Sequence, residues 1–188
     1  MKKFIILSFI FISSFYLFAE GTNLGKPAST IAEEIYGKDS VEMIAKYKIN
    51  NTSYEYAFVK INADRFLVLK SEKSAGEDYN IYLFAAVDVE EDKEKIKNIV
   101  IELNEKASKE GDSSCTVFTY YVYGKPVYFF IINGKLYGSF CFINELYGKG
   151  KYQVECYIDD QEVIASLENL VEKWNKYQDN ELLKSLGL

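Results

Sequence analysis

Three aspartates come closest to a catalytic pair by their type and spacing: Asp88, Asp159 and Asp160. Acid–base catalysis by carboxylates needs two of them beside a substrate, in environments that separate their pKa values. These aspartates instead stand where the sequence predicts the starts of helices. At such a position the side chain accepts a hydrogen bond from a free amide, and a glutamate three residues after the cap, Glu91 or Glu162, reaches back. Helix capping accounts for them, and we predict no catalytic residue.

The chain contains no histidine. This removes the commonest general base, the histidine-activated serine and cysteine nucleophiles, and the usual nitrogen ligand of zinc. The acidic run Glu90–Lys95 lacks the alternating oxygen ligands and central glycine of a calcium loop. Its negative charge suits a helix start, where it complements the dipole. We predict no metal and no cofactor.

Three cysteines are present, Cys115, Cys141 and Cys156, without the C-x-x-C spacing of redox or zinc sites. Cys141 and Cys156 are placed symmetrically about the turn-like segment Tyr147–Gly150. They should therefore face each other on neighbouring strands, as a structural disulfide or as two buried thiols. Cys115 would then be the spare thiol.

The N-terminus predicts a secretory signal peptide over residues 1–19. Lys2 and Lys3 precede the apolar run 4–12, and Ala19 supplies a small residue at the expected cleavage site. The run is short for a membrane span, which needs about 20 apolar residues. We expect export to the periplasm or the extracellular space.

The remaining chain, residues 20–188, is long enough for one domain with its own core. It holds no further apolar stretch of spanning length, so we expect no membrane span in the mature form. The formal net charge of the full sequence is −6, and removal of Lys2 and Lys3 with the signal peptide makes it −8. Such a charge repels phosphate backbones and argues against a nucleic-acid partner.

Alternation of apolar and polar residues predicts two groups of strands. The first is Ile44–Asn50, Tyr54–Ile61, Arg65–Ser71 and Asn80–Val87; the second is Cys115–Tyr123, Val127–Ile132, Lys135–Phe142 and Tyr152–Ile158. Apolar stripes predict a helix after each group, over 89–109 and 160–177, and a short helix over 29–37 that ends at Gly37. Residues 40–48 fit either a helix or a strand.

Both groups follow the same order of strands, turns, helix cap and apolar stripe, which indicates a tandem repeat. At one constant offset, Phe58–Asn62 falls on Phe129–Asn133 without a gap. Asn133-Gly134 between apolar runs predicts a tight hairpin. We expect an α+β fold with antiparallel sheet built from two ββββα units, about 41–109 and 112–180, plus the short N-terminal helix. The two meanders could join edge to edge or stack face to face.

Aromatic residues are abundant, with 16 Tyr and 13 Phe. Strand alternation divides them between two faces. The repeat assigns to the helix-covered face Val117, Phe130, Ile132, Val154, Cys156 and Ile158, as partners of Val59, Ile61, Leu83, Ala85 and Val87. The other face receives Tyr120, Phe129, Phe140 and Phe142. Such a face needs a cover, which could be a second sheet, a second copy, a protein partner or a small apolar or aromatic-stacking ligand.

These features favour an exported, non-catalytic binding or protein-interaction module whose ligand the sequence does not name. The surface for the ligand would be the aromatic face around Tyr120, Phe129, Phe140 and Phe142. A secreted enzyme inhibitor is the alternative, because small αβ modules suit that role. A hydrolase that uses carboxylates is less favoured, because no two acids converge away from helix caps.

Overall fold

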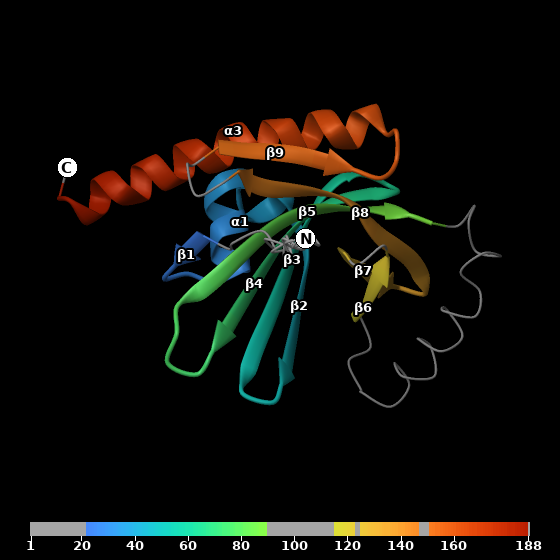
Figure 1. Cartoon of the computed structure of the whole chain (residues 1–188), viewed down its shortest axis with the longest axis horizontal. Coiled ribbons are helices and arrows are strands. Elements are labelled where there is room, and N and C mark those ends of the chain that lie inside the picture. The colour runs from blue at the N-terminus through green and yellow to red at the C-terminus, as the bar shows by residue number, and fades with distance from the viewer. Residues whose placement is uncertain (1–21, 90–114, 123–124, 147–150, 188) are drawn as a thin grey trace, which may run out of the picture.

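The computed structural model describes residues 22–89, 115–122, 125–146 and 151–187 (Figure 1). The predicted signal peptide, 1–19, lies outside the described residues. The helix predicted over 89–109 also lies outside them, apart from Val89.

The described chain is an α+β arrangement of one antiparallel sheet with helices against one face. The strands are β1 Thr22–Leu24, β2 Val41–Ile49, β3 Thr52–Asn62, β4 Arg65–Ser74, β5 Tyr79–Asp88, β6 Cys115–Val122, β7 Lys125–Ile132, β8 Lys135–Leu146 and β9 Lys151–Cys156. The helices are α1 Ala28–Tyr36, the short 3₁₀ helix η1 Lys38–Ser40 and α3 Gln161–Ser185. The sheet order is β2-β3-β4-β5-β8-β7-β6, with β1 beside β5 and β9 beside β8.

Local sequence signals set the ends of several elements. Asn133 and Gly134 both take positive φ, 50° and 78°, as the predicted tight hairpin between β7 and β8 requires. Gly37, at φ 88°, ends α1 and donates its N–H to the Glu33 carbonyl at 2.8 Å. The ambiguous segment 40–48 is strand, because all but its first residue lie in β2.

The predicted tandem ββββα repeat is wrong, and the pairing of β8 shows why. In the first half, β4 has its chain neighbours β3 and β5 on opposite edges. Its counterpart β8 pairs with β5 along one edge, so β7 and β9 occupy successive stretches of its other edge. We call this division of one edge of β8 between β7 and β9 the fork. Gly138 pairs with Val87 and Phe129, whereas Cys141 pairs with Ala85 and Cys156. The described residues contain one helix that follows a meander, α3.

A β-bulge also reverses the face expected for part of the second half. Between β3 and β4 the register shifts at Lys60/Asn62, which inserts one extra residue, whereas the β7–β8 register runs without interruption. A shift of one residue moves side chains to the other face. Val59 therefore packs on the helix side, but Phe130, aligned with it, packs on the opposite side.

The sequence predicted six residues of the second half on the helix-covered face of the sheet. This prediction is wrong for the three in β6 and β7 and is confirmed for the three in and just after β9. The former are Val117, Phe130 and Ile132; the latter are Val154, Cys156 and Ile158, which pack against the helix-side core. On that side α3 buries the stripe Val163, Leu167, Leu170, Trp174 and Tyr177.

The opposite face is covered by the sheet itself. Phe58 on β3 and Phe130 on β7 lie with ring centroids 5.2 Å apart, although β4, β5 and β8 separate their strands in the sheet order. The Tyr47 hydroxyl on β2 donates to the Cys115 carbonyl on β6 and so joins the two end strands. The sheet therefore curls until the side chains of its two ends meet, and it buries a largely aromatic cluster inside the curl.

Side-chain contacts also hold the far part of α3 beside α1. Tyr177 donates its hydroxyl hydrogen to Glu34 at 2.7 Å, and Lys26 pairs with Glu34 and Glu181, each at 2.9 Å. Burial raises the pKa of Tyr177, and its hydrogen bond to Glu34 adds to that rise. The helix is thereby fixed along the sheet, which positions the groove described below.

Candidate functional site

The aspartates singled out in the sequence are held by partners from their own chain. Asp160, one residue after the predicted cap Asp159, accepts from the Val163 amide at 3.2 Å and from Arg65 Nε at 2.7 Å. Burial by itself would raise the pKa of Asp160, but these hydrogen bonds outweigh it and keep the pKa below its usual range. Asp88 pairs with Lys135 at 2.7 Å. These contacts explain both carboxylates without a substrate.

The cysteine pair lies where hairpin symmetry predicts it. Cys141 and Cys156 are direct partners across β8 and β9, with Cα atoms 4.1 Å apart, and they form a disulfide. Cys115 on β6 is buried and takes no part in this disulfide. In the described ranges, no group of three or more aspartate, glutamate or cysteine side chains could hold a metal ion.

The four residues proposed as a ligand surface do not form one surface. Phe129 is 3% exposed and lies 6.1 Å from the half-buried Phe140, between ring centroids. Phe142 packs against the aromatic cluster inside the curl and against Tyr157. Tyr120 pairs through its backbone with Val127, and the structure does not describe its side chain.

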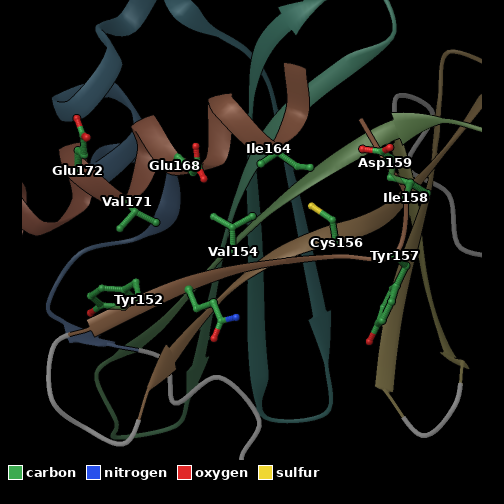
Figure 2. Close-up of a pocket in the computed structure, with 11 residues that line it drawn as sticks. Tyr152, Val154, Cys156, Tyr157, Ile158, Asp159, Ile164, Glu168, Val171 and Glu172 are labelled. Atoms are coloured by element: carbon green, nitrogen blue, oxygen red, sulfur yellow. The ribbon is translucent and has the colours of Figure 1, made fainter. Parts of the chain in front are cut away.

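A groove between β9 and α3 is one of two features that the sequence did not predict. It has a volume of about 840 Å³ and is lined by Tyr152, Gln153, Val154, Cys156, Tyr157, Ile158, Asp159, Ile164, Glu168, Val171 and Glu172. In Figure 2, Val154 and Cys156 point from the strand toward the helix, and Ile164 and Val171 point back toward the strand. These four side chains are only half-buried, so the groove exposes apolar surface.

One end of the groove is closed by a polar contact. The Tyr152 hydroxyl at the start of β9 donates to Gln178 on α3 at 2.9 Å. Together with the disulfide, this contact fixes β9 relative to both β8 and the helix. The groove is therefore a fixed part of the fold, held at its strand side by a covalent bond.

The rim of the groove is acidic. Asp159, Glu168 and Glu172 line it, and no lysine or arginine is among the described lining residues. Glu168 and Glu172 are exposed on α3 and form no ion pair with any described residue. A cationic occupant would meet these carboxylates without competition from a counterion of the described chain.

The outer edge of β9 adds backbone groups to the site. The Tyr157 amide, just after β9, donates to the Phe140 carbonyl at 2.8 Å, so the backbone groups of Tyr157 point toward β8. In an antiparallel pair such positions alternate, so Val154 and Cys156 direct their N–H and C=O groups away from β8. Among the described strands, β9 pairs with β8 alone. The groove therefore offers apolar contacts, carboxylates and strand-edge hydrogen bonds.

No family model, curated protein or solved structure matches this chain. Function is therefore argued from the site itself. Among the described helices, none combines the length and apolarity needed to cross a bilayer.

A second unforeseen feature is a buried cation. Lys70 on β4 is 5% exposed, and its ammonium donates to Glu72 at 3.1 Å and to the Tyr128 hydroxyl at 3.2 Å. The rings of Tyr54, Tyr82 and Tyr128 surround it at 5.2, 4.6 and 5.0 Å. Burial opposes the charged form, yet Tyr128 and Glu72 raise the pKa of Lys70. This aromatic cage holds the protein's own lysine and is therefore structural.

Different signals would have pointed to the two features. Lys70 directly follows the apolar run Phe66–Leu69 in a predicted strand, so alternation places it on the same face as Phe66 and Val68. A lysine buried there needs a partner. The sequence signal for the groove is weaker. Ile164 lies beside the main apolar stripe of α3 and widens it. The acids that follow it resembled an ordinary solvated helix face.

Proposed function

We propose that this protein is an exported, non-catalytic protein-interaction module, and that a polypeptide partner binds in the groove between β9 and α3. The groove carries this proposal because it combines half-buried apolar residues with an acidic rim. A cleft that combines apolar side chains with a few polar groups is typical of binding sites. This groove replaces the aromatic face, which the sequence suggested, as the proposed binding surface.

The chemistry of the groove supports binding over catalysis. Glu168 and Glu172 are both exposed and share one solvated environment, whereas an acid–base pair needs its two carboxylates in different environments. Their negative charge, with Asp159, suits a partner that carries basic side chains. An enzyme inhibitor would use the same groove, with an enzyme as its partner.

The disulfide supports export. Disulfides persist in oxidising compartments such as the periplasm and the extracellular space, and they are rare in the cytosol. Mass spectrometry of the protein from its native host should find the N-terminus at Glu20 or within a few residues of it. An intact Met1 on membrane-embedded protein would contradict the proposed export.

A display selection tests the binding proposal. The full-length protein is screened against random peptides at low ionic strength, and the selected peptides are retested on the charge-reversed variant E168K/E172K. We expect them to be basic and to lose affinity for this variant. The control is D179K, which makes the same kind of change on an exposed position of α3 outside the groove lining. Selected peptides that bind E168K/E172K as well as the wild type would refute the proposed site.

A further inference from the structure

We infer that the partner binds as an extended strand added to the edge of β9 that no described strand occupies, with basic side chains at alternate positions facing α3. This inference rests on the proposed function, because it takes the groove as the binding site. It adds the conformation of the bound segment and the pattern of its sequence.

The strand edge favours an extended occupant. Val154 and Cys156 direct their backbone donors and acceptors away from β8, and no described strand pairs with them there. An added strand would satisfy these groups with its own main chain, which gives affinity for any sequence. A helical occupant would leave them unused, because its backbone groups are already bonded to one another.

The spacing of the acids on α3 matches the spacing of side chains on a strand. Glu168 and Glu172 are four residues apart on one helix face, which corresponds to about 6 Å along the axis. Alternate residues of a strand lie about 6.6–6.8 Å apart and point to the same side. Strand β9 runs alongside α3 in Figure 1, so a strand added to it would follow the helix. Two basic residues with one residue between them therefore align with the two glutamates.

Lysine and arginine fit this side of the groove better than a compact cation does. Their aliphatic stems can lie on Ile164 and Val171, which are half-buried, while their charged heads reach Glu168 and Glu172. Exposed ion pairs add little affinity each, so the strand edge and the apolar contacts supply most of the binding. The carboxylates select the sequence by rejecting acidic segments.

Labelled peptides test the conformation. The parent peptide alternates lysine with valine over seven residues, and two derivatives carry N-methyl groups either on the lysine amides only or on the valine amides only. In a strand, alternate residues direct their N–H groups to opposite edges, so one set faces β9 and the other faces solvent. By fluorescence anisotropy, we expect one methylated derivative to lose at least tenfold in affinity and the other to bind like the parent. Equal behaviour of the two derivatives, or no binding by the parent, would overturn strand addition.

A second arm tests the charge pattern on the same protein. A peptide with glutamate in place of lysine should bind the wild type about tenfold more weakly, and E168K/E172K should reverse the preference. D179K should keep the wild-type preference. Equal binding of both peptides to wild type would overturn the proposed pattern. If display-selected peptides lose binding to E168K/E172K while the methylated pair behaves alike, strand addition fails and the proposed function stands.

Discussion

The rings of Phe58 and Phe130 meet almost perpendicularly, with an angle of 89° between their planes, and join β3 to β7 across the inside of the curled sheet. Aromatic pairs of this kind contribute about 0.5–1.5 kcal/mol beyond the burial of their area. We therefore predict that F58L and F130L are not additive in the free energy of unfolding, with a coupling in that range. Urea denaturation of the two single variants and the double variant measures it.

The matched control for this cycle is Phe129. It neighbours Phe130 in the chain but belongs to a different buried cluster, on the other side of the sheet. F58L and F129L should add to within about 0.5 kcal/mol. Equal coupling of Phe58 to both residues would contradict the curled arrangement.

Removal of the Cys141–Cys156 disulfide should destabilise the protein. The bridge joins residues that are 15 positions apart. Closure of such a loop lowers the entropy of the unfolded chain and so stabilises the folded state by roughly 3 kcal/mol. We predict a loss of up to that size in C141A/C156A, measured by urea unfolding. Wild type in excess dithiothreitol should show a comparable loss, and dithiothreitol should leave the variant unchanged. A variant as stable as the oxidised wild type would show that the disulfide does not stabilise the fold.

The pairing of Asp160 with Arg65 should appear in the pH dependence of stability. Because the pKa of Asp160 is lowered in the folded protein, its contribution is present above the unfolded pKa of about 3.9 and is lost as the pH falls through the folded pKa. D160N removes the charge but keeps a good cap, so stability at neutral pH should fall and the acid limb of the stability curve should flatten.

D160A also removes the cap. It should cost about 1 kcal/mol more than D160N at every pH. Thermal unfolding from pH 2 to 7 measures both variants. An unchanged acid limb in D160N would show that this carboxylate is not responsible for the dependence.

Removal of Lys70 should leave a cage that accepts another cation. Three tyrosine rings face the ammonium, and aromatic faces attract quaternary ammonium groups. We predict that K70A is destabilised and that choline raises its melting temperature but leaves the wild type unchanged. The neutral isostere 3,3-dimethylbutanol is the control. Equal effects of the two compounds on K70A would contradict a cation–π cage.

Local features of the fold were predictable where short sequence signals determine geometry. Asn133-Gly134 and Gly37 require positive φ, so they mark a hairpin and a helix end without any knowledge of distant residues. The Cys141–Cys156 pairing follows from the symmetry of a single hairpin. These features depend on neighbours in the chain, and a pattern of a few residues contains the information.

The topology of the sheet and the groove could not be predicted in this way, because they depend on strand register and on pairing between distant parts of the chain. One bulged residue between β3 and β4 reverses the faces that the repeat assigns to Phe130, and both arrangements have the same apolar pattern. The position of β9 follows from the pairing of β5 with β8, which joins distant parts of the chain. The acids on α3 become part of a groove only after this pairing brings β9 beside them.

The fork divides one edge of β8 into two stretches with different structural roles. The stretch paired with β7 supports the aromatic interior, whereas the stretch paired with β9 supports the groove. Substitutions in β9 or on the outer face of α3 can therefore change what is recognised while the interior packing stays intact. A natural lineage or a protein engineer could diversify the specificity of this scaffold without first re-optimising its core.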